Sequence, residues 1–249
     1  MKREGLGTLR PLGEDVSAAG WIVDAVRALD EHVVASLVPP VFEAYARVVH
    51  PAHRLDETGR EVEVTWAEVA AANGRRAHAG MEWIGITGSW RYLHGDTQPG
   101  VWDTEPEEGS LPAAQAAALV QVLARFTATP RECFYAVWNG FGASAVPPAA
   151  RTVQMPGREM LLLRGPLSQA ATVSMETPPW QQSPSLWWPA DRSWCVATDV
   201  DLMSTYIGAG AACIEAITTD PALEAWPVDS RHGITYDSDT LNPVPAPTP

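Results

Sequence analysis

The hydrophobic and polar positions of this 249-residue chain repeat with two different periods, which predicts a mixture of helices and strands. Apolar residues that recur every three or four positions indicate amphipathic helices. Thr65 and Glu68 have the spacing of a capping box, which indicates a short helix that ends at Asn73 and Gly74. Helices are expected from about Ser17 to His32, over 65–74, between Ser110 and Pro130, near Leu167 to Val173 and from about Ala211 to Thr218.

Shorter apolar or alternating runs, bounded by Gly and Pro, predict the strands. Strands are expected at Phe42 to Val49, over 133–140, at Met160 to Leu163, within 193–207 and at Leu223 to Val228, with loops and at most one short strand from Ala79 to Val101. Helices and strands follow one another irregularly. This favours an α+β fold, with a mixed, mainly antiparallel central sheet flanked by helices and a βαβ-like element near the C-terminus.

The chain is expected to form one domain over residues 1–241. Its 46% hydrophobic content is enough for a large core. A segment rich in Gly, Ala and Pro near 142–151 offers an alternative division into two lobes. Residues 242–249 read NPVPAPTP, which predicts a disordered tail.

The net charge and the cysteine content indicate in which cellular compartment the protein lies and which classes of partner it binds. The chain has 17 basic and 30 acidic residues, and the net charge of -13 repels nucleic acid and anionic membrane surfaces. The cysteines Cys133, Cys195 and Cys213 lie far apart without CxxC spacing, which indicates reduced, buried thiols. No apolar run has the length of a signal or membrane-spanning segment. These features predict a cytoplasmic protein without a nucleic-acid or membrane partner, and they leave the oligomeric state open.

The stretch TYIGAGAACIEAI reads as a strand, a glycine turn and a helix. Gly208 and Gly210 match the first two glycines of a dinucleotide-binding fingerprint, and Asp229 stands where its ribose-binding acid would be. The third glycine position is occupied by Cys213, and too little chain follows Asp229 for the further strands of a Rossmann domain. We therefore interpret this stretch as an ordinary turn.

Tryptophans are concentrated in one segment of the second half. Trp180, Trp187, Trp188 and Trp194 lie within fifteen residues, and Tyr206 follows on the next predicted strand. Such rings either cover the face of a sheet or form a flat platform for a planar ligand, a sugar or a proline-rich peptide. They are the candidate ligand-binding residues of the sequence.

Two pairs of residues are candidates for a metal site. Asp199 and Asp201 would share one face of a strand, and His50 and His53 lie three positions apart in HPAH. Together they could hold a divalent metal ion for a hydrolase. The alternative is that the aspartates end a solvated strand and the histidines lie in a loop. No GxSxG, HExxH or P-loop motif is present.

Three strings, FEAYARVVHPA, LPAAQAAALVQVLARFTATPREC and SPSLWWPADRSWCVATDVDLMSTYIG, give the chain a family resemblance. Over nearly its whole length the chain resembles a family of uncharacterised actinobacterial proteins of unknown function. The resemblance assigns no activity, cofactor or catalytic residue to these positions.

The sequence therefore favours a non-catalytic domain that needs no cofactor and binds a small molecule or a protein through a Trp-rich surface. The alternative is a metal-dependent hydrolase that uses His50 and His53 with Asp199 and Asp201. The two hypotheses differ in whether these four side chains converge in one pocket.

Overall fold

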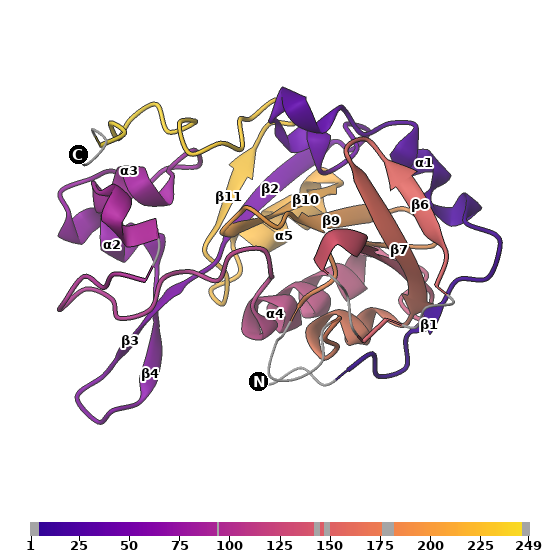
Figure 1. Ribbon diagram of the computed structural model, residues 1–249, viewed down its shortest axis with the longest axis horizontal. Coiled ribbons are helices and arrows are strands. Elements are labelled where there is room, and N and C mark those ends of the chain that lie inside the picture. Colours follow the sequence, from indigo (N-terminus) through magenta and orange to yellow (C-terminus); the bar gives the residue numbers. More distant parts are fainter. Residues whose placement is uncertain (1–4, 94, 142–144, 147–149, 176–181, 246–249) are drawn as a thin grey trace.

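The computed structural model describes residues 5–93, 95–141, 145–146, 150–175 and 182–245. It contains a large sheet with helices packed against it and, beside one end of the sheet, a smaller group of elements (Figure 1). We call this smaller group, residues 52–104, the lateral group. Within the described ranges, none of the helices combines the length and the apolar character needed to cross a lipid bilayer.

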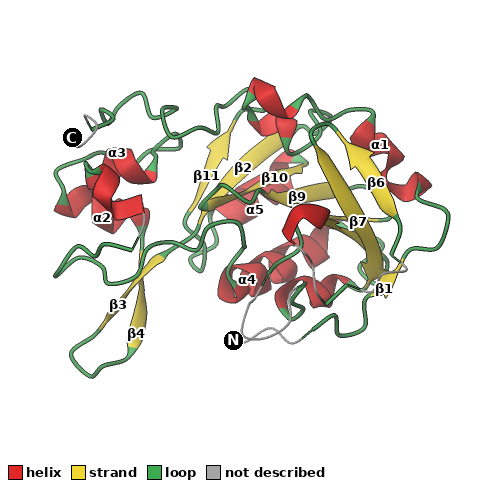
Figure 2. Ribbon diagram, viewed as in Figure 1, coloured by secondary structure: helices red, strands yellow, loops and turns green. Residues whose placement is uncertain are grey.

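Nine strands form the large sheet, in the order β1-β7-β5-β8-β9-β10-β2-β11, with β6 beside β7. Figure 2 shows the strands of this sheet together with the helices around it. Every strand pairing among the described residues is antiparallel. This confirms the predicted α+β class and the mainly antiparallel sheet. The strands of the sheet are β1 (Arg10–Pro11), β2 (Ala44–Val49), β5 (Cys133–Trp138), β6 (Thr152–Met155), β7 (Arg158–Gly165), β8 (Leu186–Pro189), β9 (Trp194–Thr198), β10 (Ser204–Ala209) and β11 (Ala225–Val228).

Helices cover both faces of this sheet. The α-helices are α1 (Gly20–Val23), α2 (Trp66–Ala72), α3 (Trp83–Thr87), α4 (Ala113–Leu123) and α5 (Ala211–Thr218). The 3₁₀ turns are η1 (Ser17–Ala19), η2 (Leu29–Glu31), η3 (Val34–Ser36), η4 (Trp90–Leu93), η5 (Ala124–Phe126), η6 (Asn139–Phe141) and η7 (Leu167–Ala171). One core lies between the sheet and α4, α5 and η7, and a second lies between the opposite face and α1, η1 and η3. Nearly every residue of β2, β8, β9 and β10 is buried. Because successive side chains of a strand point to opposite faces, both faces of these strands are covered.

The predicted βαβ-like element is formed by β10, α5 and β11. Both strands pair antiparallel with β2, which lies between them, so β10 and β11 run parallel to each other. Helix α5 is the crossover, and its buried residues Cys213, Ile214 and Ile217 pack into the first core. Gly208 lies within β10, and Gly210 is the N-cap of α5.

The two glycines have different structural roles, which substitution by alanine should reveal. A Cβ atom at Gly208 would overlap Phe42 Cδ2 and lie 2.8 Å from Val38 Cγ1, whereas at Gly210 the nearest atom, Glu43 Oε2, would be 3.7 Å away. We expect Gly208→Ala to lower the free energy of unfolding by about 1–3 kcal/mol because it overpacks the core. Gly210→Ala is the matched control and should change it by less than about 0.5 kcal/mol. Urea denaturation of both variants measures this, and equal effects would contradict the packing role of Gly208.

The single helix expected from Ser17 to His32 is wrong. The structure has η1 and α1, and the chain then leaves the helical conformation, with Ala28 at φ -59° and ψ 141°. The Arg27 amide donates to Ala35 O at 2.9 Å, so the chain folds back on itself. The apolar residues that suggested one helix instead pack on the sheet in successive short turns, which shows that tertiary packing outweighs the local pattern here.

The lateral group has its own core. It begins with the hairpin of β3 (Ala52–Leu55) and β4 (Glu61–Val64), which is followed by α2 and α3. The capping box of Thr65 and Glu68 is present, as predicted. The region 79–101, expected to lack helices, contains α3 and η4. Trp83 lies between Trp66 and Trp102 in this core, with ring centroids 5.4 Å and 5.3 Å from theirs.

The C-terminal segment, residues 234–245, folds back along α3 (Figure 1). Asn242, the first residue of the expected disordered tail, is 2% exposed, and its side chain bonds to the backbone N and O of Arg76 at 2.9 Å each. The Trp90 indole donates to Pro245 O at 2.7 Å. Contacts with residues of the lateral group are therefore present beyond the expected boundary at 241, as far as Pro245, and residues 246–249 lie outside the described residues.

The expected division into lobes near 142–151 falls partly outside the described residues. Strand β5 precedes this segment and β7 follows it, yet the two strands pair along the six residues of β5. The central sheet therefore includes strands from both sides of the segment.

Candidate functional site

Three of the four tryptophans expected to form a contact surface lie in the core. Trp187, Trp188 and Trp194 are at most 1% exposed, and Trp180 lies outside the described residues. Trp187 and Trp188 are adjacent in β8 and therefore enter opposite cores, where Trp187 packs edge-on against Trp194 at 5.4 Å. The three described rings do not form an exposed surface, because each faces a covered side of the sheet. Tyr206 is also buried, at 1% exposure.

The four residues expected to hold a metal do not gather around one point. His50 is fully buried, and its Nε2 lies 2.9 Å from Thr205 Oγ1 and its Nδ1 2.6 Å from Glu107 O. His53 lies on β3, in the hairpin that leaves the sheet. Asp199 and Asp201 do converge, but on the guanidinium of Arg158, at 2.8 and 3.7 Å. Among the described residues, no group of three or more His, Cys, Asp or Glu side chains is arranged to hold a metal ion.

A cavity of about 410 Å³ lies between the lateral group and the sheet. We call it the cleft. Its walls come from segments far apart in the sequence, which include β2, α3, β7, the turn 199–203 and residues 234–236. Apolar side chains such as Leu29, Ile84 and Met203 line it together with the rings of Trp66, Trp83 and Tyr236.

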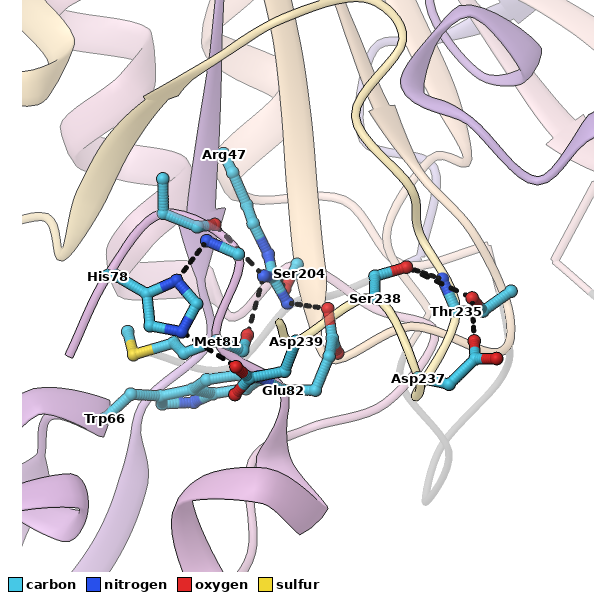
Figure 3. A network of polar contacts seen from close by, with 12 residues as sticks. Arg47, Trp66, His78, Met81, Glu82, Ser204, Thr235, Asp237, Ser238 and Asp239 are labelled. Carbon is cyan, nitrogen blue, oxygen red and sulfur yellow. Dashed lines mark hydrogen bonds and ion pairs between the residues drawn. The ribbon is translucent and has the colours of Figure 1, made fainter. Parts of the chain in front are cut away.

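The first polar feature of the cleft is the ion pair of Arg47 and Glu82 (Figure 3). Arg47 extends from β2 with its side chain 2% exposed, and its Nη2 lies 3.1 Å from Glu82 Oε1. Its Nε donates to Ser204 Oγ at 2.9 Å, and its Nη1 donates to the carbonyl oxygens of Met81 at 2.7 Å and Ala79 at 3.3 Å. The guanidinium also lies over the ring of Trp66, 5.3 Å from its centroid. Nearly all donors of Arg47 are therefore used within the protein.

Glu82 is the N-cap residue of α3, and its side chain is 13% exposed. Burial raises the pKa of this carboxyl to about 7, because the charged form is poorly solvated. Arg47 opposes this rise, while the nearby charges of Asp239 and Asp237 add to it. Glu82 can therefore both accept and release a proton near neutral pH.

The C-terminal segment holds Glu82 in place through Asp239. The Glu82 amide donates to Asp239 Oδ2 at 3.2 Å, and His78 Nε2 lies 2.9 Å from Asp239 Oδ1 (Figure 3). Asn242 donates to both carboxylate oxygens of Asp239, at 2.8 Å each. Although burial alone would raise the pKa of Asp239, these hydrogen bonds hold it below its usual range. A charged Asp239 thus anchors the start of α3.

The second polar feature is the ion pair of Arg158 and Asp199. The two side chains are 12% and 10% exposed, and the Arg158 guanidinium lies 4.7 Å from the ring centroid of Trp138. Burial raises the pKa of Asp199, and Arg158 opposes this rise. A smaller, mainly apolar cavity of about 40 Å³ adjoins the cleft here, because Leu29, Arg158 and Asp199 line both.

Sequence reasoning identified Asp199 and Asp201 in this site but missed Arg47 and Glu82. A signal for Arg47 was available, since it interrupts the otherwise apolar end of a predicted strand, in AYARVV. Such a residue is expected to be buried with a partner when both faces of the strand are covered. The sequence gives no comparable signal for Glu82, because this residue precedes α3 in a region where the sequence predicts loops.

No family model matches the chain, and the comparisons with curated proteins and with solved structures found no significant match.

Proposed function

We propose that this protein binds a small organic molecule in the cleft. The observation that supports the proposal is a cavity of about 410 Å³ whose mixed apolar and aromatic wall carries two largely buried arginine–carboxylate pairs. Ligand sites in proteins typically have volumes of roughly 300–1,000 Å³ and combine an apolar wall with a few converging polar groups. The proposal keeps the ligand-binding function expected from the sequence and moves it from the Trp-rich segment to the cleft.

The polar groups of the cleft are held in fixed positions, which favours binding with little loss of conformational entropy. Arg47 is fixed by Ser204, Met81 and the ring of Trp66. Glu82 is fixed through its backbone by Asp239. A ligand would therefore meet a largely preformed site.

Blocking the cleft tests this proposal. Leu202 lines the cleft and is half-buried, so Leu202→Trp should fill part of the cavity without removing either ion pair. Leu241 is 49% exposed and lies outside the cleft, so Leu241→Trp is the matched control. We expect fragments that bind the wild type in saturation-transfer NMR to lose at least about tenfold in affinity in Leu202→Trp and to keep it in Leu241→Trp. Thermal melting shows that both variants are folded.

Two outcomes would contradict the proposal. One is that no fragment binds the wild type, and the other is that the bound fragments bind Leu202→Trp equally well. Ligand recovered after incubation is analysed by mass spectrometry, because Glu82 is suited to acid–base catalysis. Chemical conversion that stops in Glu82→Gln would assign the protein as an enzyme, and unchanged ligand would support a binding protein.

A further inference from the structure

We infer that the ligand of the cleft is an organic monocation, such as a protonated amine attached to a small apolar or aromatic group. This inference rests on the proposed function and specifies the chemical class that the cleft selects. It follows from the charge balance of the lining, from the pairing of both arginines with carboxylates and from the aromatic wall.

The charge balance of the cleft is negative. Among the described residues, four carboxylates and two arginines line it, together with His32; the carboxylates are those of Glu82, Glu108, Asp199 and Asp201. Counting aspartate and glutamate against arginine, this described part of the lining carries two more acidic than basic side chains. An anionic ligand would be repelled by this excess, and a cationic one would be attracted.

Both arginines of the cleft already pair with carboxylates. Arg47 directs its donors to Ser204, Ala79, Met81 and Glu82. Arg158 faces two carboxylates, at 2.8 and 3.7 Å, so the local field at its guanidinium is already compensated. An anion at Arg47 would have to displace Glu82 from a largely buried ion pair, and an anion at Arg158 would lie beside Asp199 and Asp201 and be repelled by them.

The wall of the cleft suits an organic cation. The ring of Trp66 already accepts one cation, the guanidinium of Arg47, at 5.3 Å. Tyr236 is 57% exposed and lines the same cavity, and beside its edge contact with Trp90 at 5.2 Å it offers a second aromatic ring to a cation. The cavity is much larger than a bare metal ion, and apolar residues such as Ile84 and Met203 form much of its lining. A ligand with an ammonium group could place that group near the carboxylates and its apolar body against the apolar residues of the cleft.

Binding of such a cation should be coupled to the ionisation of Glu82. This carboxyl faces Arg47 from β2, Tyr206 from β10, and Asp237 and Asp239 from the C-terminal segment. Glu108, Asp199, Asp201 and Arg158 lie around the same cavity, and the histidines nearby are His32, His78 and His232. A cation in the cleft stabilises the charged form of Glu82, so binding should release a proton and strengthen as the pH rises.

Three probes of similar size and different charge test the inference: benzylamine, which is protonated near neutral pH, benzyl alcohol and benzoate. Isothermal titration calorimetry at pH 7.5 should show benzylamine binding at least about tenfold more tightly than benzyl alcohol, with no detectable binding of benzoate. With the pKa of Glu82 at about 7, the affinity for benzylamine should rise roughly tenfold from pH 6 to pH 8.

Variants separate the role of charge from folding. Asp201 lines the cleft with its side chain 79% exposed, so Asp201→Asn should fold normally and weaken benzylamine binding by roughly three- to fivefold. Glu57→Gln removes an exposed carboxylate of the β3–β4 hairpin loop and should leave the affinity unchanged. In Glu82→Gln, checked for folding by circular dichroism, the rise in affinity with pH should largely disappear. A rise that persists would mean that histidines alone carry it and would overturn the role of Glu82.

The outcomes distinguish this inference from the proposed function. If benzyl alcohol or benzoate binds as tightly as benzylamine and is lost in Leu202→Trp, the cleft binds ligands but does not select cations, and the inference is overturned. If none of the three probes binds, the inference is likewise overturned, and the fragment screen decides separately whether the cleft binds small molecules.

Discussion

Replacing Arg47 by methionine is expected to lower the free energy of unfolding by about 3–5 kcal/mol at pH 8. The substitution leaves Glu82 without its cation and leaves the carbonyl of Met81 and the hydroxyl of Ser204 without their donor. Unpaired polar groups in a buried site cost more than the net strength of the bonds they once made. Urea denaturation at several pH values measures the loss.

The size of this loss should depend on pH, in a direction set by Glu82. In the wild type the pKa of Glu82 is raised from 4.5 to about 7, so its contribution to stability is present below 4.5 and is lost as the pH rises to 7. Without Arg47 the pKa of Glu82 rises further, because the opposing charge is gone. The variant should therefore be closest to the wild type near pH 5 and furthest from it near pH 8.

A double substitution provides the control. Arg47→Met combined with Glu82→Leu removes both charges. We expect the double variant to recover most of the stability lost in Arg47→Met, because it leaves no buried charge without a partner. A loss in the single variant that is below about 1 kcal/mol and independent of pH would contradict a buried, coupled pair. It would also weaken the view that this pair is a fixed part of the cleft.

The sheet and most of its strands could be predicted from local pattern, for reasons visible in particular residues. The alternation over 44–49, the apolar run of 133–138 and the capping box at Thr65 and Glu68 are each short-range signals. Each of these segments adopts the secondary structure that its own sequence and its nearest neighbours along the chain favour. The βαβ-like element near the C-terminus is of the same kind, since 205–228 carries strand, helix and strand in its own sequence.

The errors arise where long-range contacts decide the local structure. Residues 17–32 carry a helical pattern, but Arg27 bonds to Ala35 and the apolar side chains fit the sheet better as separate turns. Asn242 lies in a proline-rich segment typical of a tail, yet Arg76 and Asp239 bind it. Neither partner can be identified from spacing, because both contacts depend on how the chain has already folded.

The cleft shows the same limit more strongly. Its ion pair joins Arg47 and Glu82 across 35 positions, and Asp239, which anchors Glu82, lies 157 positions further on. Charged residues of common types that lie so far apart in the sequence do not form a recognisable motif. Residue type alone pointed to Asp199 and Asp201, but their partner is Arg158 of β7 rather than the histidines.

Replacing Trp187 by alanine is expected to lower the free energy of unfolding by about 3–5 kcal/mol, the cost of a large cavity in a packed core. Trp187 is 1% exposed and packs against Trp194 between the sheet and α4, whereas the half-buried Trp90 lies at the surface against Tyr236. Trp90→Ala is therefore the matched control, with an expected loss of about 1 kcal/mol from its bond to Pro245.

Urea denaturation measures the stability of both variants, and calorimetry with benzylamine measures the affinity of the molecules that remain folded. If Trp187→Ala abolished binding at little cost in stability, the Trp-rich segment would be the contact surface after all. A large loss of stability with unchanged affinity per folded molecule would instead show that these indoles build the core on which the cleft depends.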